Sequence, residues 1–399
     1  MSHVLGTLTV EEFLANYWQK KPLLIRNAIP DFESPLDPEE LAGLACEEGV
    51  EARLIESVGA NGKPWQISHG PLDDATFERL PERDWTLLVQ AVDHYVPEVA
   101  ELLEQFAFIP RWRLDDIMIS YAPEGGNVGP HVDNYDVFLL QGKGTRRWQL
   151  GGFKGEDAAI VDGISLRILE HFEISNNEDW ELAPGDMLYL PPRYAHHGVS
   201  TSNDCMTYSI GFRAPSADEV VTSWADYRGE QLSDAQRYTD PDLDAQDPAL
   251  LDDGALARVR QLMLESLDDP AQLAQWFGRY MTQTKYPDQL IALDPPIDRD
   301  SVAAALNEGA EIKRALGSRF AYRPADTDAD HESATLFVDG DGMACPLPLA
   351  QAIADNQQPL GLEQLERDEH DLLVQLVNRG SLELVTENED EFDGQANDG

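Results

Sequence analysis

The sequence predicts an α+β protein in which a barrel or jelly roll of short strands is followed by a helical segment and a winged-helix-like domain. Three observations lead to this fold class. Short strand patterns separated by turn residues dominate residues 113–213, as in barrels and jelly rolls. Helical periodicity dominates from about residue 216. A chain of 399 residues is also too long for one ordinary core, so several domains are expected.

The first hundred residues combine short helices and strands. We expect a helix over 9–17, a strand at Leu23–Arg26 and further strands at 52–57 and 65–68. Apolar residues recur at steps of three and four between 84 and 107, and this spacing predicts a longer helix there.

The predicted barrel strands follow in close succession. "DDIMISYAP" precedes the glycine-rich turn "EGGNVGP", and "GKGT" between "DVFLLQ" and "RRWQL" indicates a hairpin. "LAPGDMLYLPP" sets a turn before an apolar strand, and "CMTYSIGF" ends the series. We assign residues 1–215 to this first domain.

The rest of the chain is predicted to form two further parts and a tail. Residues 216–292 start at the N-cap Ser216 and are helical, with a bulky apolar helix at 273–281 that either packs in a core or contacts a second subunit. The order of helices and strands over 293–385 is typical of a winged helix, but its last helix begins with acidic residues, so we expect no DNA binding. Residues 386–399 contain six acids and no base, and we expect them to be disordered.

The composition is that of an acidic globular protein. A formal net charge of −45 argues against nucleic-acid or anionic-membrane surfaces and favours a basic partner. Because there are seven lysines against 22 arginines, adaptation to a salt-rich cytoplasm is an alternative reason for the charge. There is no apolar run of about 18 residues and no signal-peptide pattern, so we expect no membrane span. Three scattered cysteines suit the cytoplasm.

The stretch "GPHVDNYDVF" places an imidazole and a carboxylate two residues apart. At the start of a strand, His131 and Asp133 would project to the same face. They could form a buried hydrogen-bonded pair, or two thirds of a metal site that a later histidine completes. A set of two histidines and one carboxylate suits Fe(II) and leaves positions open. Zinc accepts the same ligands and is the competing metal.

Either of two adjacent histidines could be the third ligand, but neighbours on a strand face opposite ways. The spacing from Gly185 through Pro191 to His196 resembles the second motif of the cupin superfamily, and the spacing from Gly125 to His131 resembles the first. This resemblance favours His196, with His197 facing away or lining the mouth.

The stretch "GKGTRRW" concentrates basic residues in a chain that has few. Lys143, Arg146 and Arg147 lie on the predicted hairpin and strand right after the strand that carries the His-x-Asp motif. A guanidinium pairs bidentately with a carboxylate, which suits the distal end of 2-oxoglutarate. The keto-acid end would chelate the iron and leave one position for O₂.

Four longer stretches resemble the JmjC-type, cupin-fold 2-oxoglutarate oxygenases, and among these the bacterial ribosomal-protein arginine hydroxylases of the ribosomal oxygenase family. They are "YWQKKPLLIRNA", "DDIMISYAPEGGNVGPHVDNYDVFLLQGKGTRRWQLG", "LAPGDMLYLPPRYAHHG" and "YSIGFRAPS". The resemblance covers most of the chain. It implies a double-stranded β-helix catalytic domain, a helical dimerisation segment that makes a homodimer, and a winged-helix-like C-terminal domain.

The resemblance also implies roles for individual residues. It makes His131, Asp133 and His196 the iron ligands and Arg146 the anchor of the co-substrate, with Ser120 as a weaker candidate to assist. Arg147 is turned the opposite way by the strand. At position 197 this chain departs from the family's usual residue.

The implied substrate is an arginine of a basic large-subunit ribosomal protein, large-subunit ribosomal protein sixteen, hydroxylated at a carbon. Candidates to meet its guanidinium are Asp115, Asp116, Tyr135 and Asp136. The alternatives are hydroxylation of a histidine, demethylation of a lysine, a cupin metalloenzyme that is not an oxygenase, and a binding module.

Overall fold

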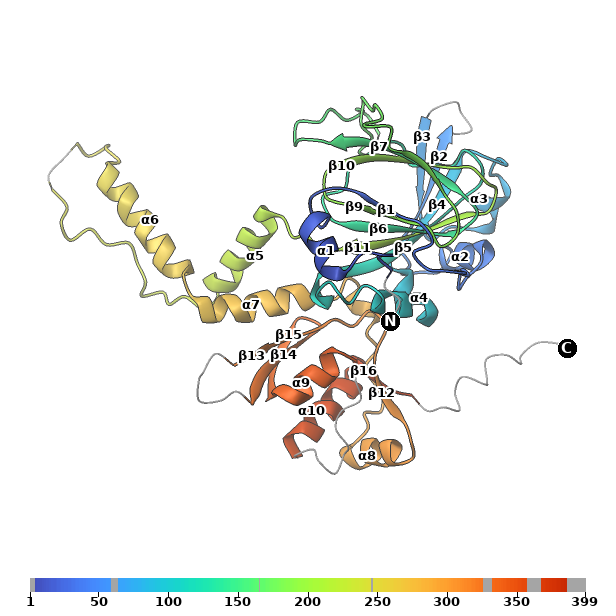
Figure 1. Cartoon of the computed structure of the whole chain (residues 1–399). Coiled ribbons are helices and arrows are strands. Elements are labelled where there is room, and N and C mark those ends of the chain that lie inside the picture. Colours follow the sequence, from blue (N-terminus) through green and yellow to red (C-terminus); the bar gives the residue numbers. More distant parts are fainter. Residues whose placement is uncertain are drawn as a thin grey trace. The chain divides into compact units, whose positions relative to one another are not determined.

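The computed structural model contains two compact units, residues 1–214 and 215–399 (Figure 1). It describes residues 4–58, 64–164, 166–244, 247–325, 332–356 and 367–385. The predicted acidic tail at 386–399 lies outside the described residues. Among these residues no helix is long and apolar enough to cross a membrane.

Two antiparallel sheets form the first unit (Figure 1). The larger sheet has the order β1 (Leu23–Ile25), β9 (Met187–Leu190), β6 (Val137–Lys143), β11 (Cys205–Phe212), β5 (Leu114–Ala122), β4 (Trp85–Val89), β2 (Ala52–Val58) and β3 (Pro64–His69). The smaller has the order β10 (Tyr194–Ser200), β7 (Arg146–Phe153) and β8 (Asp179–Leu182). The predicted jelly-roll architecture is confirmed.

The two faces of the larger sheet pack against different partners. One face is covered by helices that contribute to its core, namely α1 (Val10–Asn16), α2 (Pro38–Leu44) and α4 (Pro97–Glu104). The other face meets the smaller sheet in a second core. Strand β6 shows the alternation, because Phe138 belongs to the first core and Val137 and Leu139 to the second. The functional residues described below lie on this inner face or at its edge.

The second unit combines helices with two small sheets. Strands β13 (Phe320–Pro324), β14 (Ser333–Val338) and β15 (Asp341–Pro346) form one sheet, and β12 (Glu311–Arg314) pairs with β16 (Leu382–Val385). The helices are α5 (Ala217–Gly229), α6 (Asp253–Leu267), α7 (Pro270–Thr282), α8 (Arg299–Asn307), α9 (Leu347–Ala354) and α10 (Arg367–Asn378). Ser216 caps α5 as predicted, accepting from the backbone N–H of Glu219. The sequence predicts strands near 318–322, 334–338 and 381–385, which correspond to β13, β14 and β16, but it predicts no strand at β12 or β15.

The remaining short elements belong to loops. They are α3 (Asp74–Glu78) and the 3-10 turns η1 (Val92–His94), η2 (Arg111–Arg113) and η3 (Pro287–Gln289).

Two sequence-based predictions about the first unit are wrong, besides the strand start at His131 that the metal centre corrects below. The helix predicted over 84–107 is a buried strand, β4, followed by the shorter helix α4. All five residues of β4 are buried, and a short buried strand cannot be told from a helix by the spacing of its apolar residues. The predicted hairpin at "GKGT" does not form, because β6 and β7 belong to different sheets. The turn there carries the chain from one sheet to the other, with Gly144 at φ +58°.

Candidate metal centre

Three side chains that are distant in sequence meet at the edge of the inner face. One ligand atom from each of His131, Asp133 and His196 lies within 4.8 Å of the others. Asp133 Oδ2 is 3.5 Å from His196 Nε2 and 3.9 Å from His131 Nε2. It is the one such group of potential metal-ligating residues found in the described part of the chain. The arrangement can hold one metal ion on one side and leave the other side open.

Backbone pairing, rather than a strand of its own, positions the His-x-Asp motif. Strand β6 begins only at Val137, so the predicted strand start at His131 is wrong. Instead His131 and His196 form an isolated antiparallel bridge, in which each backbone N–H donates to the other's carbonyl at 3.0 Å. Asp133 O accepts from Arg193 N at 2.7 Å. The motif is therefore held along the edge of β10, which carries the third ligand.

Hydrogen bonds fix which nitrogen of each imidazole faces the centre. His131 Nδ1 lies 2.9 Å from Gly129 O, and His196 Nδ1 lies 2.9 Å from Tyr194 O. A carbonyl can only accept, so each Nδ1 carries the proton and each Nε2 presents a lone pair. This pattern is typical of metal-ligating histidines.

Burial keeps the third ligand neutral. The side chain of His196 is 3% exposed, and burial, with His131 as a neighbour, lowers its pKa to about 4. Its ring also lies 5.8 Å from that of Trp148. An uncharged imidazole at neutral pH is the form that binds a metal.

The buried guanidinium of Arg146 fits a carboxylate ligand. Arg146 lies on β7, opposite Ser200 of β10, and is 3% exposed. Its Nη1 donates to Gly198 O at 3.5 Å, while Nε and Nη2 have no hydrogen-bond partner among the described residues. A buried charge with unpaired donors is costly unless a ligand satisfies them.

Three other residues singled out from the sequence lie away from the three candidate ligands. Arg147 faces outward as expected and forms a bidentate ion pair with Asp179, at 2.6 and 2.7 Å. Ser120 is buried on the inner face of β5, and its Oγ donates to Thr207 O at 3.5 Å. His197 turns away from Asp133, and its Nε2 lies 3.3 Å from Asn127 Oδ1.

The candidates to meet the substrate guanidinium lie in different environments. Asp116 is 3% exposed on β5, and its two carboxylate oxygens accept from Gln90 Nε2 at 3.0 and 2.9 Å. Asp136 is fully buried on the opposite side of the sheet, where it accepts from Tyr189 Oη at 2.6 Å. Tyr135 is 42% exposed, and the neighbouring Asp133 carboxylate raises its pKa.

Sequence reasoning missed three residues that shape the site. Gly129 supplies the acceptor for His131, Asn127 binds this turn, and Gly198 leaves room for the Trp148 ring, which an added Cβ would overlap. Asn127 is the one polar residue within the "GGNVG" turn, and this position could have marked it as a residue that hydrogen-bonds the turn.

Comparisons with known proteins agree with this geometry. Family models match for a JmjC domain at residues 101–220, a ROXA-like winged helix at 265–383 and an AraC-like ligand-binding domain at 174–279. The ribosomal protein uL16 3-hydroxylase of Escherichia coli is 37% identical over 352 residues, which cover 88% of this chain and 90% of the relative. The chain belongs to the JmjC-domain ribosomal oxygenases. The predicted fold class and enzyme class are thereby confirmed.

Solved structures of a bacterial ribosomal oxygenase extend the match to nearly the whole chain. The X-ray structure of E. coli YcfD is 35% identical with a TM-score of 0.84, covering 95% of this chain and 99% of that one. A second YcfD structure, in complex with cobalt and 2-oxoglutarate, has a TM-score of 0.82 at 35% identity and covers 96% and 99%.

Proposed function

We propose that this oxygenase uses Fe(II), 2-oxoglutarate and O₂ to hydroxylate an arginine side chain of ribosomal protein uL16. The observation that carries the proposal is the pairing of strands β7 and β10. It places Arg146, opposite Ser200, on the same inner face as His196, which lies opposite Leu150. A chelating keto acid needs a metal centre with open positions and a cation for its distal carboxylate. The buried guanidinium of Arg146, whose Nε and Nη2 have no hydrogen-bond partner among the described residues, fits the second requirement. The names of the relatives supply the substrate class.

Each residue of the site has a proposed role in binding the metal or the co-substrate. His131, Asp133 and His196 would hold Fe(II), which together with 2-oxoglutarate supplies the power to oxidise an unactivated C–H bond. Arg146 would bind the distal carboxylate of the co-substrate, and Ser120 would assist from β5. The apolar inner core, including Leu139, Leu188 and Trp148, excludes water from this region.

Asp116 is the acidic residue best placed to receive the substrate guanidinium. It is buried on the inner face of the larger sheet, and Gln90 holds its carboxylate in place. Asp136 is unsuited because it is enclosed on the other face with Tyr189. The negative charge of the whole chain would attract a basic ribosomal protein to this site.

The second unit supports the proposal of a homodimer. Helix α6 packs against α5 and projects away from the β13–β14–β15 sheet in Figure 1. Several of its apolar side chains are exposed to solvent in the single chain, Leu256 to 59%, Val259 to 43% and Met263 to 58%. A second copy of this chain would cover them. The proposed dimerisation segment is therefore 216–292.

Two further parts of the proposal come from the sequence. Residues 293–385 would form a winged-helix-like domain that does not bind DNA, and the protein would act in the cytoplasm.

Mass spectrometry of a uL16 fragment tests the proposed reaction. The fragment is incubated with the protein, Fe(II), 2-oxoglutarate and O₂, beside an Asp133→Ala control. We expect an added oxygen on an arginine with the wild-type protein alone. Consumption of 2-oxoglutarate without that product would refute the substrate, and no consumption at all would refute the reaction.

A further inference from the structure

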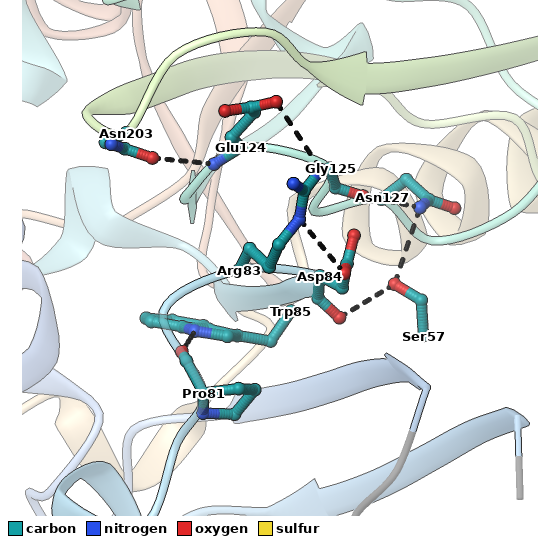
Figure 2. Close-up of polar contacts among 9 residues, drawn as sticks. All are labelled: Ser57, Pro81, Arg83, Asp84, Trp85, Glu124, Gly125, Asn127 and Asn203. Carbon is teal, nitrogen blue, oxygen red and sulfur yellow. Dashed lines mark hydrogen bonds and ion pairs between the residues drawn. The ribbon is translucent and has the colours of Figure 1, made fainter. Parts of the chain in front are cut away.

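The turn that leads from β5 to the first metal-site histidine is closely packed by its neighbours (Figure 2). A Cβ added at Gly125 would overlap Asp84 Oδ1, and one at Gly126 would overlap the backbone oxygen of Trp85. Asp84 N also donates to Glu124 O at 3.1 Å. The conformation of the turn is therefore set by contacts outside it.

Asn127 ties this turn together and links it to β2, as Figure 2 shows. Its Nδ2 donates to Gly125 O at 2.9 Å and to Ser57 Oγ at 3.4 Å, and its Oδ1 accepts from Gly129 N at 3.0 Å. A backbone carbonyl only accepts and a backbone N–H only donates, so these partners fix the orientation of the amide.

The same amide reaches the strand of the other metal-site histidine. Asn127 Oδ1 lies 3.3 Å from Nε2 of His197, which follows His196 directly on β10. Because Oδ1 is an acceptor in this orientation, His197 donates through Nε2–H. Backbone hydrogen bonds join the turn to Ser200 of β10, from Gly125 N to Ser200 O at 2.9 Å and from Ser200 N to Gly126 O at 3.0 Å. Between these bonds and the backbone bridge of His131 and His196, Asn127 adds a side-chain contact to β10.

Gly129 transmits this arrangement to His131. Its N–H is held by Asn127, and its carbonyl, 2.9 Å away, orients Nδ1 of His131. Gly129 has φ +78°, which glycine adopts without strain, and the hydrogen bond from its N–H to Asn127 Oδ1 restrains this flexible residue.

We propose that Asn127 is a positioning residue of the metal centre, which holds Gly129 O against His131 and holds β10 through His197. This inference rests on the proposed metal site. Outer hydrogen-bond partners of metal ligands typically change metal affinity by about 10- to 100-fold when they are removed.

Cobalt titration of the full chain tests the role without requiring turnover. Co(II) binding and the visible absorption of bound Co(II), which reports ligand geometry, are measured for wild type, Asn127→Ala and Asn203→Ala. Asn203 is the matched control, because its Oδ1 accepts from Glu124 N at 3.3 Å on the opposite side of the same turn in Figure 2. We expect Asn127→Ala to weaken Co(II) binding by about 10-fold and shift the spectrum, and Asn203→Ala to change neither.

The variant His197→Phe tests the same role if Asn127→Ala does not fold. His197→Phe retains an aromatic ring beside Phe172, whose ring centroid is 5.9 Å from that of His197, but removes the Nε2–H donor. We expect a spectral shift in the same direction, and no further shift when it is combined with Asn127→Ala. Unchanged affinity and spectrum in both single variants would refute the positioning role alone. Failure of the wild-type protein to bind Co(II) more tightly than Asp133→Ala would refute the metal site as well.

Discussion

Replacement of Arg146 by methionine should have opposite effects on co-substrate binding and on stability. Methionine keeps much of the length and apolar volume of arginine but none of its donors. Loss of one partner from a buried charge pair costs about 2–5 kcal/mol. The KM for 2-oxoglutarate should therefore rise by roughly 30-fold to 4,000-fold, at about 1.4 kcal/mol per tenfold.

Without ligand, the same substitution should stabilise the fold. The Arg146 Nε and Nη2 atoms are buried without a partner among the described residues, and each unsatisfied donor costs about 1–3 kcal/mol. The free energy of unfolding of the metal-free Arg146→Met protein in urea should thus equal or exceed that of wild type.

Arg147→Met is the matched control, because Arg147 is the next residue of β7 but its side chain is 55% exposed and paired with Asp179. Its KM for 2-oxoglutarate, measured by succinate formation, should stay at the wild-type value. An unchanged KM in Arg146→Met, or an equal rise in both variants, would show that Arg146 does not bind the co-substrate.

Three further predictions concern pH, substrate and assembly. In the metal-free fold burial lowers the pKa of His196 and of His197 to about 4, below the ordinary 6.5. Between these two pH values the unfolded chain therefore binds more protons than the folded chain. The free energy of unfolding should fall as the pH drops from about 6.5 to about 4, by about 3 kcal/mol for His196. Equal urea midpoints at pH 7 and pH 5 would contradict this. Asp116→Asn should lower kcat/KM for an arginine-bearing uL16 fragment by about 30-fold or more, while the affinity for 2-oxoglutarate stays constant; an unaffected fragment would exclude Asp116 as the acceptor. Leu256→Asp on α6 should convert a dimer to monomer in sedimentation equilibrium, whereas an unchanged mass, or a monomeric wild type, would refute the proposed interface.

The sequence was most informative where geometry follows from a short spacing. The Gly-x₅-His-x-Asp and Gly-x₅-Pro-x₄-His patterns led to His131, Asp133 and His196, which the structure brings together. Alternation along a strand separated Arg146 from Arg147, because neighbours on β7 face opposite sides.

What the sequence could not predict depends on contacts between distant segments. Strand β4 looks helical by its spacing, and only its place between β5 and β2 makes it a strand. The pairing of His131 with His196 is a backbone bridge across 65 positions of the chain, which no local pattern encodes. The role of Asn127 likewise depends on Ser57 and His197, neither of which is near it in sequence.

Anomalous X-ray scattering from crystals grown with Co(II) and 2-oxoglutarate would test the proposed centre most directly. We predict one cobalt peak bound by Nε2 of His131, Nε2 of His196 and the carboxylate of Asp133. We also predict a co-substrate that chelates the cobalt and reaches the Arg146 guanidinium with its distal carboxylate. A cobalt peak elsewhere, or a co-substrate carboxylate remote from Arg146, would contradict it.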